Sequence, residues 1–171
     1  MKKEELEHIM EEILENAKSL LSRDGYIAPV AFLCIGNEIR VIPLNFKNRE
    51  EKERQVVLLT KVARLENADA LIMVAESWYV ISNKPSLEIE PSKHPMRKEC
   101  IFVIGEYEEG DITISQQFER EDKEGDRIIF GDRDNMNTSG FSKFNFGIKN
   151  RKKYDNSILK PDINYSKSNL N

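Results

Sequence analysis

Residues 70–81 constrain the fold of this chain more than any other segment. The run from Ala70 to Ile81 is mostly apolar, and both of its alternating sets of positions carry apolar side chains. A strand with one face in water would show apolar residues at every second position only. We therefore expect a central strand in a sheet that is covered on both faces.

Two segments predict helices. From about residue 3 to residue 22, apolar residues recur at steps of three and four, and Gly25 follows where a left-handed C-terminal cap is expected. Asn48, with Glu51 three positions later, forms a capping-box pattern that opens a second helix over about residues 49–66. The first half of that helix is almost wholly charged and the second half almost wholly apolar, so we expect only the second half to be packed.

The other apolar runs predict strands. Residues 30–35 and 39–42 flank Gly36-Asn37 and suggest a hairpin, and residues 100–107, 112–118 and 127–130 suggest an antiparallel meander. The predicted order is α-β-β-α-β-β-β-β. Short connections and an excess of strands favour an α+β fold, with a single mixed or mostly antiparallel sheet of about six strands and two helices on one face.

The charge distribution divides the chain near Gly131. Residues 132–171 contain eight Lys or Arg, four Asp and eight Asn, which gives them a net charge of +4. Because the whole chain carries −4, residues 1–131 carry −8. We predict an α+β domain over residues 1–131 and a basic, Asn-rich tail over 132–171, either disordered or docking on a partner.

Cysteine usage and hydropathy suggest a cytoplasmic protein, or one of the host cytosol or virion if the gene belongs to a phage. Cys34 and Cys100 each lie in an apolar run, which is typical of reduced core cysteines. The charged N-terminus resembles no secretion signal, and no apolar run approaches the roughly 20 residues that span a bilayer. We expect neither a disulfide nor a membrane segment.

A polar cluster around Glu76 is the one candidate site. Glu76 interrupts the most apolar strand, where a carboxylate is costly unless it is paired. Residues that could meet it are Trp78, His94, Arg97 and Glu99. Three interpretations stay open: a structural tie in which Arg97 pairs with Glu76 or Glu99 and His94 bonds a loop carbonyl, a pocket for an anionic or planar ligand, or catalysis or metal binding by Glu76, His94 and Glu99.

No motif of a known catalytic or cofactor site is present. The chain lacks Gly-x-Gly-x-x-Gly, a phosphate-binding loop, paired Cys-x-x-Cys and a Gly-x-Ser-x-Gly elbow. The second histidine, His8, lies on the first predicted helix, away from any ligand spacing. We therefore predict no cofactor and no metal, and catalysis is the less favoured interpretation.

The tail alternates aromatic and basic residues. Basic groups can neutralise phosphates and aromatic rings can stack on unpaired bases, so single-stranded nucleic acid is one candidate partner. Docking on a protein partner or a second subunit is the other, and it is favoured because the acidic body would repel a duplex. The candidate contact residues are Phe141, Lys143, Phe144, Phe146, Lys149, Arg151, Lys152, Lys153 and Tyr154.

Two short patterns carry a family resemblance. The strand pattern Ala75-Glu76-Ser77-Trp78 is followed by the segment Pro91-Ser92-Lys93-His94-Pro95-Met96-Arg97-Lys98-Glu99. Together they resemble an uncharacterised family of small prokaryotic and phage-associated proteins, over residues 24–107. The resemblance implies no activity, but it implies that the Glu-bearing strand and the polar loop belong to one unit. Taken together, the sequence favours a non-catalytic interaction or assembly protein, with a small enzyme or a ligand- or metal-binding protein as the alternative.

Overall fold

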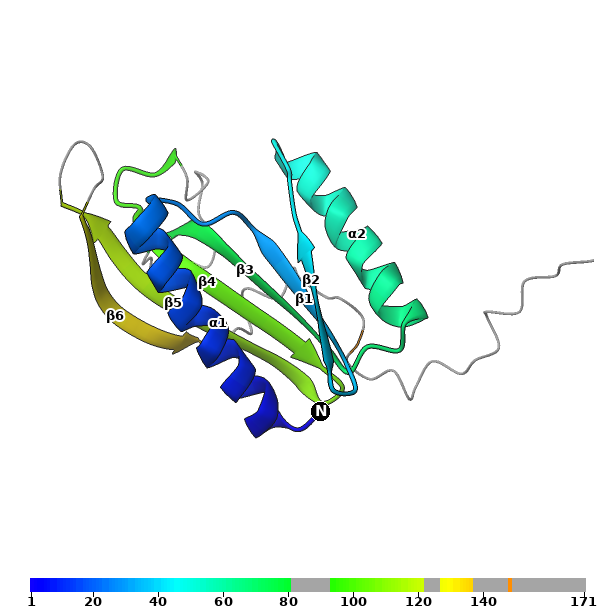
Figure 1. Ribbon diagram of the computed structural model, residues 1–171. Helices are drawn as coiled ribbons and strands as arrows, with labels where there is room; N and C mark the ends of the chain where they lie inside the picture. The colour runs from blue at the N-terminus through cyan, green and yellow to red at the C-terminus, as the bar shows by residue number, and fades with distance from the viewer. Residues whose placement is uncertain (81–92, 122–126, 137–147, 149–171) are drawn as a thin grey trace, which may run out of the picture.

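The chain folds around one antiparallel sheet. The computed structural model describes residues 1–80, 93–121, 127–136 and 148. The sheet has the strand order β2-β1-β3-β4-β5-β6, and every neighbouring pair of strands is antiparallel (Figure 1). The elements are α1 (Lys3–Asp24), β1 (Val30–Ile35), β2 (Glu38–Pro43), α2 (Arg49–Leu65), β3 (Ala70–Tyr79), β4 (Lys98–Tyr107), β5 (Gly110–Arg120) and β6 (Ile128–Met136). The α+β class, the six-stranded sheet and the order of elements are confirmed.

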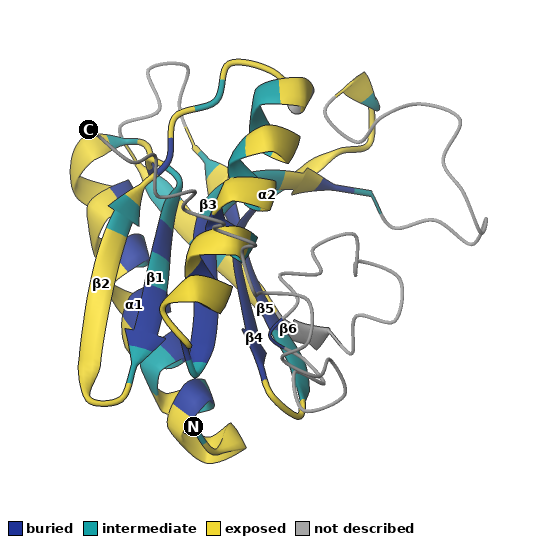
Figure 2. Ribbon diagram, turned by 90° about the vertical axis from the view of Figure 1, so that its right-hand side faces the viewer, coloured by how far each residue is buried: buried dark blue, intermediate teal, exposed yellow. Residues whose placement is uncertain are grey.

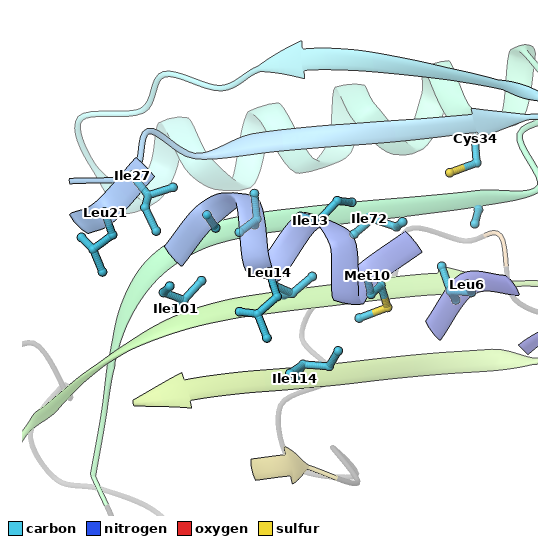
Figure 3. Packing of buried hydrophobic residues seen from close by; sticks show 14 of the residues in the cluster. Leu6, Met10, Ile13, Leu14, Leu21, Ile27, Cys34, Ile72, Ile101 and Ile114 are labelled. Atoms are coloured by element: carbon cyan, nitrogen blue, oxygen red, sulfur yellow. The ribbon is translucent and has the colours of Figure 1, made fainter. Parts of the chain in front are cut away.

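Helix α1 covers one face of the sheet. Its buried side chains, among them Leu6, Met10 and Leu14, pack against Ile72, Ile101 and Ile114 of three neighbouring strands (Figure 3). The helix ends in the predicted left-handed cap, since Gly25 has φ 74° and its N–H donates to the Leu21 carbonyl at 2.9 Å.

Helix α2 lies on the opposite face, so the prediction of both helices on one face is wrong. Leu59 and Ala63 of α2 share a second core with Leu71 and Met73, whereas the alternate β3 residue Ile72 belongs to the α1 core. Figure 2 shows the sheet between the two helices. The physical reason is the apolar character of β3 on both alternations: each helix has a single apolar face and can cover only one side of the sheet. Among the described residues, no helix is long and apolar enough to cross a membrane.

Strand β6 runs past the predicted boundary at residue 131. It continues to Met136, and Arg133, which the charge distribution assigns to the tail, pairs with Gln116 in the sheet register. The register shifts between Gln116 and Phe118, where the β6 strand contains a bulge, and the Gln116 side chain donates to the Gly131 carbonyl at 2.8 Å. Glycine in a strand often marks a bulge. Gly131 therefore lies at a bulge within the strand and does not end it.

One residue beyond β6 belongs to the core. Ile148 is only 1% exposed and joins the cluster on the α2 side of the sheet. Its N–H donates to the carboxylate of Glu106 on β4 at 2.6 Å, and Glu106 is itself 2% exposed. The segment predicted as a tail therefore supplies two parts of the body: residues 132–136 of β6, and Ile148.

The two cysteines are free and buried in different cores. Cys34 lies on the α1 side of the sheet and Cys100 on the α2 side. Burial raises the pKa of the Cys34 thiol to about 11 and that of Cys100 to about 12. Both groups therefore stay protonated and unreactive near neutral pH.

Candidate functional site

The polar cluster lies on the α1 face of the sheet, beyond the C-terminal end of the helix. Glu76 of β3 and Glu99 of β4 both point to this face, as the alternation of the buried residues on each strand requires. Arg120, the last residue of β5, follows Phe118 by two positions and therefore points to the same side. The side chains of Glu76, Glu99 and Arg120 are 23%, 30% and 27% exposed, so the cluster is largely withdrawn from water.

Arg120 joins three separate parts of the chain. Its Nη2 lies 3.0 Å from Oε2 of Glu76, and its Nε lies 3.3 Å from Oε2 of Glu99. Its Nη1 donates to the carbonyl of Gly25, the cap residue of α1, at 2.6 Å. A cation at a helix C-terminus also meets the negative end of the helix dipole. All three guanidinium nitrogens are thus occupied, and the carbon of that group lies 5.2 Å from the centroid of the Phe118 ring.

Glu76 is equally occupied. Its Oε1 accepts a hydrogen bond from the backbone N–H of Ile27 at 2.5 Å, while its Oε2 accepts from Arg120. Ile27 follows the α1 cap and is buried in the α1 core. The carboxylate and the guanidinium therefore hold the segment after α1 against β3, β4 and β5.

The structure brings some of the predicted site residues together and separates others. Glu76 and Glu99 share Arg120, and Trp78 is the register partner of Glu99 but remains 42% exposed. His94 accepts a hydrogen bond at Nδ1 from Met96 N–H at 3.1 Å, and its carbonyl accepts from the Arg97 N–H, so its described contacts lie within its own turn. The guanidinium that contacts both Glu76 and Glu99 belongs to Arg120, and the pairing expected for Arg97 stays a prediction.

Sequence reasoning misses Arg120 because this residue opens a hydrophilic run. Residues 119–126 have the composition of a turn, so their first members are not assigned to a strand. The available signal is alternation: Phe118 and Arg120 continue the spacing of Ile112 and Ile114. The alternation alone does not show that Arg120 lies near Glu99. That placement also requires the register of β5 with β4, in which Phe118 pairs with Glu99.

Among residues 1–80, 93–121, 127–136 and 148, no three His, Cys, Asp or Glu side chains are grouped closely enough to hold a metal ion. The predicted tail contacts Phe141, Lys143, Phe144 and Phe146, together with the run 149–154, lie outside the described residues, as do Pro91 and Ser92.

Comparison with known families shows the family of the chain. The family described as "Bacteriophage lambda protein ea47" matches residues 1–148. The chain belongs to the bacteriophage lambda ea47 family. The match ends at the buried residue Ile148, and it is wider than the 24–107 region that carries the resemblance. The predicted phage association is confirmed, whereas the two short patterns themselves remain untested. No curated protein and no solved structure matches the chain significantly.

Proposed function

We propose that this ea47-family chain is a non-catalytic interaction protein that acts in the host cytosol by binding another protein chain. The observation that carries the proposal is a set of large apolar side chains left in water on α2. Leu58 is 58% exposed, Val62 39% and Leu65 73%. They follow one another at steps of four and three residues, so they form a single stripe along the helix.

The polar cluster supports a binding role over a catalytic one. A catalytic acid or nucleophile needs a group that is available to a substrate, in reach of a proton or a reacting atom. Glu76 and Arg120 instead use their oxygens and nitrogens to bond Ile27, Gly25 and each other. We interpret this cluster as a structural tie, the first of the three sequence interpretations, with Arg120 as its cation.

Charged segments of the chain provide a second way to bind a protein partner. Helix α1 carries seven acidic residues and three basic ones, and the residues after Ile148 contain six Lys or Arg and two Asp. An acidic helix and a basic extension of the chain suit protein docking better than binding of a duplex, which α1 would repel. Arg133 already makes such a contact within the chain, because it pairs with Glu11 of α1.

Complex formation during phage growth tests the proposal. We expect the chain, isolated from phage-producing cells, to elute as a complex larger than one chain. Leu58→Gln with Leu65→Gln should abolish that complex, because it makes the exposed stripe polar. The matched control is Val57→Gln, a residue that is 53% exposed on another flank of α2. A chain that elutes as a free monomer in every case would contradict the proposal, as would equal losses from both variants.

A further inference from the structure

Strand β2 forms an open edge of the sheet with backbone groups directed outward. It is the terminal strand in the described order, and five of its six residues are exposed. The hairpin turn has two residues, Gly36-Asn37, with φ 56° at Gly36, and its closing pair is Ile35–Glu38. Such a turn makes the closing pair hydrogen-bonded, and bonded pairs then alternate along the ladder. Glu38, Arg40 and Ile42 therefore bond to β1, whereas Ile39 and Val41 direct their N–H and C=O groups away from it.

On the α1 side of the sheet, the side chains along this edge are apolar. Ile39 and Val41, 46% and 60% exposed, lie opposite Cys34 and Phe32 and so point to the α1 side. On the other side, the exposed stripe of α2 adjoins the same edge.

Contacts from α2 establish that proximity. Glu66, just after α2, pairs with Arg40 of β2 at 3.1 Å, and Gln55 accepts from the Asn45 N–H at 3.2 Å. The apolar stripe lies next to the flank that makes these contacts, because Leu58 follows Gln55 by three positions and Glu66 follows Val62 by four.

We propose that a second copy of the chain occupies this edge, with the two β2 strands paired antiparallel about a two-fold axis. This inference rests on the proposed interaction function and names its surface and partner. The two sheets become one continuous sheet of twelve strands, six from each copy. The Arg40–Glu66 and Asn45–Gln55 contacts place the two α2 helices on the same face of the joined sheet, one on each side of the axis. Their exposed stripes then lie on the sides nearest the axis.

Charge complementarity selects the register. When the two β2 strands pair about a two-fold axis perpendicular to the sheet, each residue and its partner in the other copy must point to the same face of the sheet. Few registers of this short strand meet that condition. Centring the pair on Ile39 places Glu38 opposite Arg40 of the partner subunit, twice by symmetry. Centring it on Arg40 would oppose two like charges, which destabilises a cross-strand pair. In the favoured register the outward N–H and C=O groups of Ile39 meet those of its symmetry mate.

The other edge of the described sheet is less suited to such pairing. Strand β6 contains the bulge beside Gly131, and bulges protect edges because they twist the strand away from a straight partner. Strand β2 keeps an unbroken register with β1 from Val30–Pro43 to Ile35–Glu38. The Glu38 and Arg40 side chains of β2 complement a strand that presents the same two charges in reverse order.

A charge-swap experiment on the full chain tests the register. By sedimentation equilibrium we expect the wild type to be a dimer at micromolar concentrations. Glu38→Arg alone and Arg40→Glu alone should each weaken the dimer by at least about tenfold, because each opposes like charges across the axis. An equimolar mixture of the two variants should recover the dimer. In the mixed pair, one chain presents basic side chains at both positions 38 and 40, and the other presents acidic side chains at both. Thermal midpoints control for the loss of the Arg40–Glu66 pair within one chain.

Cysteine cross-linking gives an independent readout. Ile39→Cys places two thiols opposite each other, at the Cα separation of about 5.5 Å that a disulfide accepts. Mild oxidation should give a covalent dimer quickly. The matched control is Ile129→Cys, a 43% exposed apolar residue on the β6 edge, which should cross-link far more slowly. The native thiols of Cys34 and Cys100 do not interfere, because both are buried.

The outcomes separate this inference from the proposed function. A monomeric wild type, failure of the mixture to recover the dimer, or equal cross-linking at positions 39 and 129 would overturn the β2-to-β2 dimer. If the purified chain is monomeric but the complex from phage-producing cells still requires Leu58 and Leu65, the occupant is a different protein. The self-pairing inference then fails while the interaction function stands.

Discussion

At the scale of single residues, Arg120 joins three separate parts of the chain outside the apolar cores. It bonds the cap carbonyl of α1 and two carboxylates on neighbouring strands. A carboxylate in a largely buried position is stable only with such partners, and losing one of them leaves a charge that is poorly solvated. Arg120 therefore makes Glu76 tolerable in the central strand.

We predict that Arg120→Ala lowers the free energy of unfolding by about 1–3 kcal/mol, the cost of leaving a partly buried polar group unsatisfied. Arg97→Ala should change it by less than about 0.5 kcal/mol, because Arg97 is exposed. Denaturant unfolding followed by circular dichroism measures both variants. An equal loss from the two would show that Arg120 is not the principal partner of the cluster.

At the scale of elements, the distance between α1 and the sheet depends on Gly105. An added Cβ at this position of β4 would lie 2.6 Å from Met10 Sδ and 3.2 Å from Leu6 Cδ1. Both of those side chains are fully buried in the α1 core. The glycine thus lets the helix lie close to the strand, and neighbouring apolar residues such as Val103 fill the remaining space.

We predict that Gly105→Ala destabilises the protein by about 1–3 kcal/mol, because it overpacks a filled core. Gly110→Ala is the control, since its Cβ would meet only Tyr107 at 3.8 Å, an ordinary contact. Thermal unfolding of the two variants under the same conditions gives the comparison. Equal midpoints for Gly105→Ala and the wild type would mean that Met10 and Leu6 move aside without cost.

At the scale of the whole molecule, the folded body includes residues that the charge distribution assigns to the tail. Strand β6 extends to Met136, Arg133 pairs with α1, and Ile148 fills a place in the α2-side core. The ea47-family match ends at the same residue, 148. The region that follows Ile148 holds six of the eight basic residues of the predicted tail, and its docking on a partner stays a prediction.

Truncation distinguishes body from tail. A chain that ends at residue 148 should unfold at nearly the midpoint of the full chain. A chain that ends at 136 should lose about 2–4 kcal/mol, because it exposes the Ile148 site and removes a hydrogen bond to the buried carboxylate of Glu106. Calorimetry of the three chains tests this. Equal stability of the 136 and 148 chains would show that Ile148 contributes little.

Local patterns suffice for the helices, their caps and the hairpin. Both helices, the Gly25 cap and the hairpin at Gly36 are predictable because caps, turns and periodicity are set by near neighbours in the chain. The Asn48 cap is predictable in the same way and is present, with its side chain accepting from the Glu51 N–H at 2.9 Å. The polar part of β6 is not predictable, because Asp and Asn are depleted in strands and only pairing with β5 stabilises them there.

The sequence by itself determined that this chain has a central strand apolar on both faces, two amphipathic helices and a carboxylate in need of a partner. Only the tertiary structure decided where the helices go and which cation pairs with Glu76. The apolar residues of β3 and β4 require cover on both sides, yet a helix pattern does not state which side it will cover. The partner of Glu76 depends on the register of β4 with β5, which brings residues 44 positions apart into contact. Such contacts arise from the packing of the whole chain, and no short stretch of sequence contains them.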